Sequence, residues 1–146
     1  MEPLPPKHSI LQACRGTAPD DRFVLRCACR LAELHEQRLA TTTATNGIDH
    51  QRADLVYEID QWVAAHVPRA HGAARLHTET VGTVIDRLAQ FSALTYLTLT
   101  DAPDGVVHDA ARRLSELAIA YDDLVGDVAA GLCRLPDLGG CHSFEG

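Results

Sequence analysis

Aromatic and basic residues are scarce in this sequence. Its 146 residues include one Trp, three Tyr and three Phe, and 13 Lys and Arg stand against 20 Asp and Glu, which gives a formal net charge of −7. Binding to a nucleic-acid backbone depends on clustered cations, and single-stranded bases stack on aromatic side chains. We therefore expect no nucleic-acid partner.

Long apolar runs are also missing. No stretch approaches the roughly 18 consecutive apolar residues of a membrane-spanning helix, and the start from Met1 to Pro6 lacks the apolar segment of an export signal. The five cysteines are an odd number, which does not suit a disulfide framework. These features predict a cytoplasmic protein with reduced thiols and no contact with a membrane.

Signatures of metal and cofactor sites are absent or incomplete. The sequence has no glycine-rich phosphate loop, no nucleophile elbow and no His-Glu-x-x-His motif. Cys133, Cys141 and His142 come closest to zinc-ligand spacing but lack a second pair, and His71 and His77 lack a carboxylate partner. We predict no bound metal and no cofactor.

Apolar residues at helical spacing, in contrast, are abundant. Four segments carry amphipathic stripes with steps of three and four, and no segment alternates with the period of a strand. Asp20 or Asp21 and Thr78 offer N-caps for the first and third segments. The stripes run from Val24 to Arg38, Ile48 to His66, Val81 to Leu99 and Val107 to Leu135. Because short connections make neighbouring helices antiparallel, the sequence predicts an all-α, up-down-up-down four-helix bundle.

The bundle is expected to form one domain over residues 20–135. Four prolines within residues 1–19 predict an irregular N-terminal arm, with at most a short helical turn from Ser9 to Cys14. Pro136 and the glycines that follow it predict a flexible tail over residues 136–146.

Polar side chains interrupt the stripes at one level of the predicted bundle. Counted from the turns, His35 and Arg38 should face the same layer as Arg52, with Thr95 on the opposite side. Buried arginines stay charged and must be neutralised, so the functional interpretation is an anion pocket. In it, Arg38 and Arg52 clamp a carboxylate or phosphate, Thr95 contributes a hydroxyl, and His35 exchanges a proton. Tyr121, inside the apolar repeat of the fourth helix, either binds the ligand as well or has a structural role.

A structural interpretation of the arginines remains open. Arg38 and Arg52 could extend into solvent along their apolar stems, or pair with acidic residues at the edge of the bundle. The acidic candidates are Glu36, Asp49 and Glu58.

Three segments resemble a known family. Residues 76–88 contain Thr-Glu-Thr-Val-Gly followed by Ile-Asp-Arg-Leu, which is similar to the "TET.G..IDRL" signature of the bacterial domain-of-unknown-function family 4254. Residues 52–60 resemble its "RNDLIE.ID" segment, and Leu34-His35 resembles its "LH..N" helix. The resemblance implies an all-helical fold with no established activity, and it places His35 and Arg52 in motif positions.

The same resemblance singles out Glu79, Asp86 and Arg87. Because Glu79 and Asp86 point away from the apolar seam on a helical wheel, we interpret the three residues as a surface for a partner. The first and third helices have few large apolar residues, so a homodimer that covers further surface is also expected.

Three functions are compatible with this sequence. The first is binding of a small anionic metabolite, as an accessory factor in a biosynthetic pathway. The second is acid–base catalysis on a carboxylate-bearing small molecule by a dehydratase, cyclase or isomerase, with His35 as the proton-transfer group. The third is an interaction module without a ligand.

Overall fold

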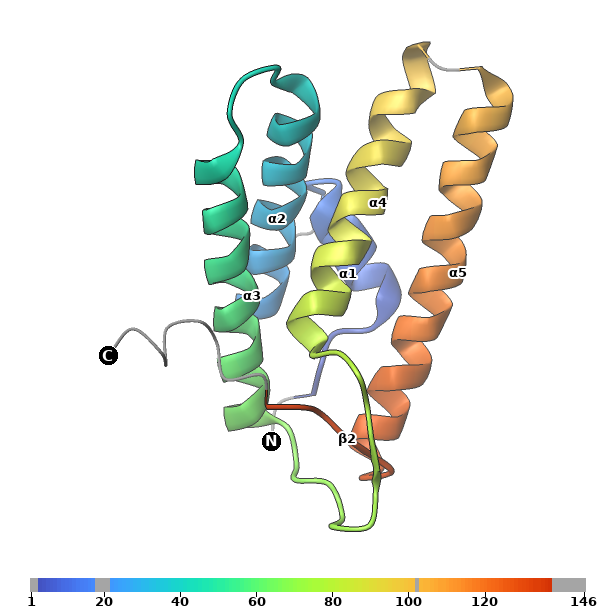
Figure 1. The fold of residues 1–146 in the computed structure, drawn as a ribbon. Coiled ribbons are helices and arrows are strands. Elements are labelled where there is room, and N and C mark those ends of the chain that lie inside the picture. Colours follow the sequence, from blue (N-terminus) through green and yellow to red (C-terminus); the bar gives the residue numbers. More distant parts are fainter. Residues whose placement is uncertain (1–2, 18–21, 102, 138–146) are drawn as a thin grey trace.

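The structure is a computed structural model that describes residues 3–17, 22–101 and 103–137. The fold is all-α, as the sequence predicts, and Figure 1 shows the helices in chain order. They are α1 (Lys7–Cys14), α2 (Phe23–Ala40), α3 (Asn46–His66), α4 (Val81–Asp101) and α5 (Asp104–Ala129). Two short strands, β1 (Arg75–Leu76) and β2 (Cys133–Arg134), complete the described elements.

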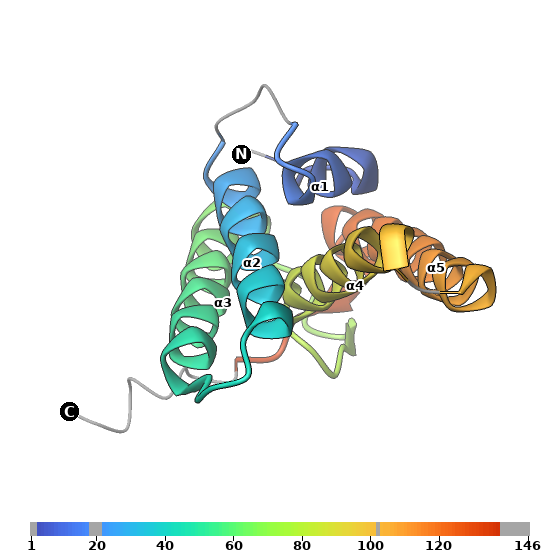
Figure 2. The same ribbon diagram turned by 90° about the horizontal axis from the view of Figure 1, so that it is seen from above.

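Helix α4 is the centre of the molecule. It packs against every other helix, most extensively against α2 and α5, and its Ile85 and Leu88 are fully buried. Among the described residues α5 contacts neither α2 nor α3, and α1 fills the space between α2 and α5 (Figure 2). The four long helices, α2 to α5, therefore form an open bundle, and the short helix α1 completes it.

The N-terminal segment belongs to the core. The predicted helical turn from Ser9 to Cys14 is part of α1, but the expectation of a mostly irregular arm is wrong for its described part. Ile10 of α1 is fully buried, and Tyr121 of α5 donates its hydroxyl to the Pro5 carbonyl over 2.8 Å. Asp122 accepts the backbone N–H of Lys7 over 2.8 Å. Pro3, Pro5 and Pro6 precede the helix, where their missing N–H groups remove no helical hydrogen bond, and Pro6 is the N-cap. Pro19 lies outside the described residues. Asp20 and Asp21 lie outside the described residues.

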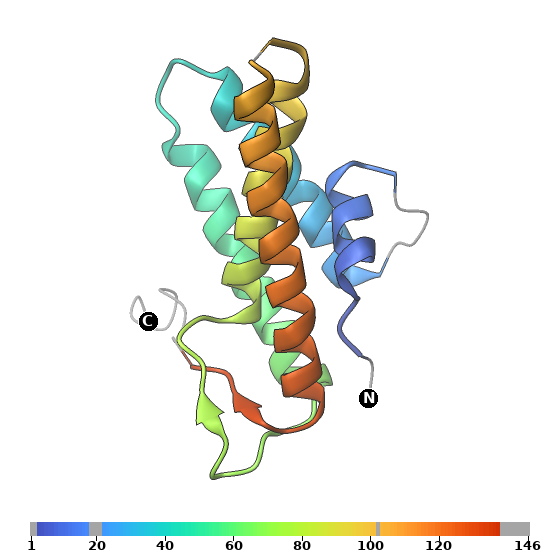
Figure 3. The same cartoon turned by 90° about the vertical axis from the view of Figure 1, so that its right-hand side faces the viewer.

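Helix α5 ends earlier than the apolar stripe suggests. Gly131 adopts a left-handed conformation with φ of 73°, and the N–H groups of Gly131 and Leu132 bond back to Val128 and Asp127. This Schellman motif stops the helix at Ala129. The chain then forms β2, which pairs in parallel with β1 at the base of the molecule (Figure 3). The expectation that no strand forms is thus corrected by one two-residue pairing.

The beginning of α4 lies very close to α3. Thr80, rather than the predicted Thr78, caps α4, because its hydroxyl accepts the backbone N–H of Thr83 over 3.2 Å. A Cβ on Gly82 would lie 2.5 Å from the Val56 carbonyl oxygen and 2.7 Å from Asp60 Oδ1. Only glycine allows the two helices to approach to this distance, and the approach fixes one side of the site described below.

Candidate functional site

Asp86 of α4 is the centre of a charged cluster that joins three helices. Its Oδ1 lies 2.8 Å from Nε2 of His35 on α2, and its Oδ2 accepts a 2.8 Å hydrogen bond from Nη2 of Arg52 on α3. Arg52 Nε also donates to Oδ1 over 3.3 Å. Burial raises the pKa of Asp86, but the hydrogen bonds and charges of His35 and Arg52 outweigh it and hold the pKa below its ordinary value. Asp86 is therefore a stable anion.

This geometry corrects the surface role predicted for Asp86. Its side chain is 17% exposed and turns toward α2 and α3 rather than away from the seam. The other two residues of that predicted surface, Glu79 and Arg87, form a two-pronged ion pair at the start of α4. Arg87 remains 42% exposed, so this pair lies on the surface and stays a candidate for partner contact.

His35 contacts Asp86 from the buried side of the cluster, away from the groove. Its side chain is 5% exposed, against 17% for Asp86 and 23% for Arg52, and it does not line the adjacent groove. A proton-transfer residue must reach its substrate directly or through one water. The predicted acid–base role of His35 lacks that access, and its imidazole instead bonds to the Asp86 carboxylate.

Asp49 extends the cluster to the surface. Its Oδ1 accepts hydrogen bonds of 2.9 Å from both Arg52 Nη1 and Arg38 Nε. The hydrogen bond from Arg38 is the main cause that lowers the pKa of Asp49. Arg38 is 47% exposed and lies outside the groove, so the predicted clamp of two arginines does not form. The pairing with Asp49, one of the structural alternatives, is what the structure shows.

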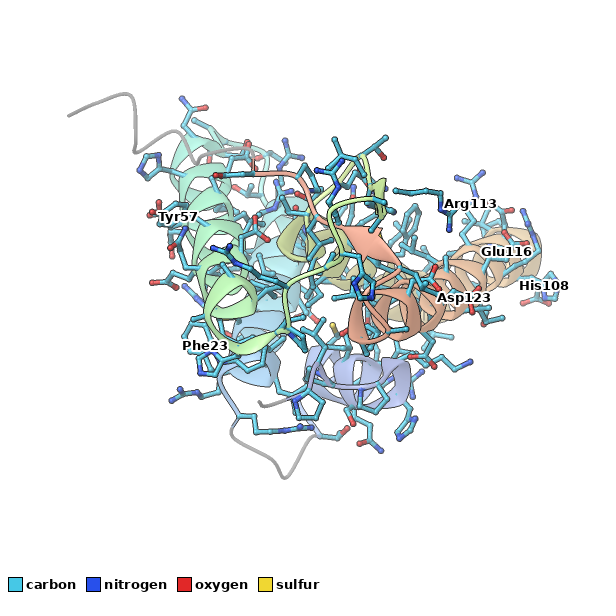
Figure 4. All side chains as sticks on the ribbon, turned by 90° about the horizontal axis from the view of Figure 1, so that it is seen from below. Phe23, Tyr57, His108, Arg113, Glu116 and Asp123 are labelled. Carbon is cyan, nitrogen blue, oxygen red and sulfur yellow. The ribbon has the colours of Figure 1, made fainter. Side chains whose placement is uncertain are left out.

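A groove of about 1000 Å³ begins at this cluster and follows α3. Its walls come from α3, the start of α4, Val128 of α5, and β2 with the residues that follow it. Tyr57 lines the groove, and Figure 4 shows it on the opposite side of the molecule from Arg113 and Glu116 of α5. The groove therefore belongs to the α3 side, away from the charged outer face of α5.

Asp60 is a second groove carboxylate, which the sequence interpretation missed. Its Oδ1 accepts the Gly82 N–H over 2.8 Å, and Thr80 donates a further hydrogen bond. Burial raises its pKa, and these two neutral donors offset the rise only in part. The sequence did contain a hint of this site. Asp60 is the last residue of the family-like segment 52–60, and it bonds to Gly82 of the other family-like segment, residues 76–88.

Two further predicted ligand-binding residues are not in the groove. The Thr95 hydroxyl donates to the Phe91 carbonyl of its own helix over 2.8 Å. Tyr121 is fully buried in the core, where burial raises the pKa of its phenol. Arg52 is thus the one predicted ligand-binding residue that the structure places in the groove, and Asp86 joins it from the predicted partner surface.

Neither a membrane segment nor a metal cluster is found in the described part of the chain. No helix there is both long and apolar enough to cross a bilayer, and no three His, Cys, Asp or Glu side chains group closely enough to hold a metal ion. Cys141 and His142, two of the weak zinc candidates, lie outside the described residues.

Comparison with known proteins gives a family without a described activity. No curated protein and no solved structure matches the chain significantly. The model of one family, described as "Protein of unknown function (DUF4254)", matches residues 28–136. This range contains the Asp86 cluster and the α3 wall of the groove, and it covers most of the chain. The protein therefore belongs to the DUF4254 family.

Proposed function

We propose that this protein binds a small anionic molecule in the groove along α3, with Arg52 as its anchor. The observation that carries the proposal is the hydrogen bonding of Arg52. A guanidinium has five N–H groups, and three of those of Arg52 bond to Asp86 and Asp49. The other two have no partner among the described residues, and Arg52 lines the groove.

The surroundings of Arg52 favour recognition of an anion. Asp86 and Asp49 hold the guanidinium from two sides, so little side-chain freedom remains to be lost when a ligand binds. The hydrogen bond from Arg52 to Asp86 is the first cause that raises the pKa of the guanidinium, so its charge is permanent. Two free N–H groups on one planar cation suit a carboxylate or phosphate.

Conservative substitutions test this proposal. Arg52→Lys keeps a cation beside Asp86 but removes the guanidinium, and Arg38→Lys is the matched control because Arg38 also bonds Asp49 yet lies outside the groove. NMR titration with inorganic phosphate, succinate and octanoate should show at least one probe bound by the native protein. We expect Arg52→Lys to weaken that binding about tenfold or more.

The control defines what would overturn the proposal. Arg38→Lys should leave the affinity unchanged. If none of the three probes binds, or if Arg52→Lys and Arg38→Lys bind as tightly as the native protein, Arg52 is only a structural cation and the proposal fails.

The proposed place of the protein in the cell is that of a cytoplasmic accessory factor in a biosynthetic pathway. The four described cysteines, Cys14, Cys27, Cys29 and Cys133, are unpaired, which suits a reducing compartment. A binding protein of this kind would hold or deliver its ligand for another enzyme. Metabolite analysis of the protein purified from its own source, with Arg52→Lys as control, would identify a retained ligand.

A homodimer is part of the same proposal. Tyr96, Leu97 and Leu99 near the end of α4 and Val106 at the start of α5 are between 44% and 58% exposed. Apolar groups gathered at one tip lose contact with water when a second copy covers them. Native mass spectrometry should show a dimer that Leu99→Glu dissociates, and a monomeric native protein would refute this part.

Acid–base catalysis is a second candidate, with Asp60 in place of His35. A carboxyl group with a raised pKa in a groove that also contains a cation is a common feature of proton-transfer sites. Measurement of the Asp60 pKa by carbon-detected NMR, with and without octanoate, tests it. An ordinary carboxyl pKa that is insensitive to a bound probe would remove Asp60 from consideration.

A further inference from the structure

A second cavity of about 160 Å³ adjoins the groove at the far end of α3. The two cavities share Val67, Pro68 and Val128. The remaining lining of the second cavity is Pro3, Leu4, Val125 and Ala129, so none of its side chains has a polar atom. This cavity is partly open to solvent, and its volume is close to that of apolar cavities that accept a benzene-sized hydrocarbon. The end of a hydrocarbon chain is therefore the matching occupant.

The wall of the groove along α3 between Arg52 and this cavity carries both apolar and polar side chains. Ala53, Val56, Val63 and Ala64 are the apolar ones, and Tyr57, Asp60 and Gln61 lie among them. Asp60, the acidic residue in between, accepts hydrogen bonds from the Gly82 N–H and the Thr80 hydroxyl, and burial raises its pKa. A hydrocarbon chain can follow the apolar side chains of the wall while the Asp60 carboxyl keeps these hydrogen bonds.

The length of the path sets the size of the ligand. At about 1.5 Å per residue, Arg52 and Val67 lie about 22 Å apart along the axis of α3. A C–C bond of about 1.5 Å advances an extended chain by about 1.3 Å, so roughly 17 bonds, or about 18 carbon atoms, cover this distance.

We infer that the ligand is a long-chain carboxylate, with its head at the two free N–H groups of Arg52 and the end of its chain in the cavity beside Val128 and Ala129. This inference rests on the proposed function and adds the class of ligand to it. Charge complementarity at Arg52 fixes which end of the chain lies where, because the far cavity offers a charged head no partner.

A series of chain lengths tests the inference. Calorimetric titration with hexanoate, decanoate and hexadecanoate, each below its micelle concentration, should give affinities that rise about two- to fourfold per methylene group, as burial of each group in an apolar site implies. Affinity that does not change with chain length would overturn the inference.

A cavity-filling substitution locates the end of the chain. Ala129→Leu places a larger side chain in the far cavity, and Ala120→Leu is a matched control at another exposed alanine of α5 that lines neither cavity. We expect Ala129→Leu to lower hexadecanoate affinity to the level of decanoate and to leave decanoate unchanged. Ala120→Leu should change neither. Equal effects of the two substitutions would refute the assignment of the cavity.

The outcomes separate this inference from the proposed function. If Arg52→Lys weakens hexanoate and hexadecanoate alike but chain length has no effect, the anion site stands and the long-chain ligand is wrong. If affinity rises with chain length but Arg52→Lys has no effect, the apolar channel exists without an anion site at Arg52, and both the proposed function and the head assignment fail.

Discussion

The two groove carboxylates, Asp86 and Asp60, differ in the kind of partner that surrounds them. Both are largely buried at the contact between α3 and α4, and both accept at least two hydrogen bonds. The partners of Asp86 include the Arg52 cation, whereas Asp60 has, in the part of the chain that the structure describes, only a backbone N–H and a hydroxyl. The pKa of Asp86 is lowered and that of Asp60 is raised. Burial alone therefore does not decide ionisation, because a neighbouring cation reverses its effect.

Removal of the Asp86 carboxylate should cause the largest loss of stability. Asp86→Ala leaves His35 and two N–H groups of Arg52 without their acceptor in a partly buried site. Breaking a buried ion pair from one side costs about 3–5 kcal/mol, and partial exposure of Arg52 reduces this to about 2–4 kcal/mol. Urea unfolding followed by circular dichroism measures the difference. A loss below about 1 kcal/mol would show that the cluster is not a structural centre.

A methyl group at Gly82 should disturb the Asp60 end by a smaller amount. Gly82→Ala places a Cβ against the Val56 carbonyl, which is backbone and cannot rotate away, so α3 and α4 must separate. We expect a loss of about 1–3 kcal/mol, typical of overpacking. Gly126→Ala is the control, because Gly126 lies in α5 with open space around it.

The control substitution should act in the opposite direction. Alanine in a helix interior is more stable than glycine by about 0.5–1 kcal/mol, so Gly126→Ala is expected to stabilise the protein. If both variants were stabilised, the close approach of α3 and α4 at Gly82 would be wrong, and the same unfolding experiment decides this.

The pH dependence of stability should separate the two carboxylates by sign. The folded pKa of Asp86 lies below its unfolded value of about 4, so its contribution is complete above that value and is lost as the pH falls through the folded pKa. The folded pKa of Asp60 lies above its unfolded value, so stability decreases as the pH rises from about 4 through the folded pKa. Asp86→Asn should flatten the acid side of the stability curve, and Asp60→Asn the side above pH about 4. Unchanged curves in both variants would contradict the opposite shifts.

Helical periodicity predicted most of the fold because it depends on local spacing. The stripes locate α2 to α5, although the last stripe runs on to Leu135 whereas α5 ends at Ala129. The segment before α2 was misjudged. Three of the four prolines that suggest an irregular arm lie ahead of α1, and the hydrogen bond from Tyr121 to Pro5 depends on a distant part of the chain. Nor could periodicity reveal that α5 would contact neither α2 nor α3 among the described residues.

The sequence predicted those parts of the candidate site that depend only on the height of a residue in the bundle and on the side of the helix where it lies. Counting from the turns brought His35, Arg38 and Arg52 to one region, and they are indeed linked through Asp86 and Asp49. The sequence placed Asp86 on a partner surface and Asp49 in an ion pair at the edge of the bundle. A helical wheel gives the direction of a side chain but not the residue of another helix that it meets. Whether a charged side chain is a ligand anchor or half of an ion pair depends on distances of about 3 Å, which sequence spacing does not contain.

Removal of an exposed ion pair on α5 should change stability least, and this variant gives the baseline against which the loss in Asp86→Ala is judged. Arg112 donates to Asp109 and Glu116 over 2.9 Å each, distances as good as those around Asp86. Its side chain is 51% exposed, so water and salt screen the charges in the folded protein and hydrate them equally well after unfolding. Arg112→Ala is expected to leave the urea midpoint unchanged within error at physiological salt. If this variant lost as much stability as Asp86→Ala, hydrogen-bond geometry rather than burial would govern the strength of ion pairs in this protein. The opposite pKa shifts of Asp86 and Asp60 would then also have to be explained by hydrogen-bond geometry rather than by burial and a neighbouring cation.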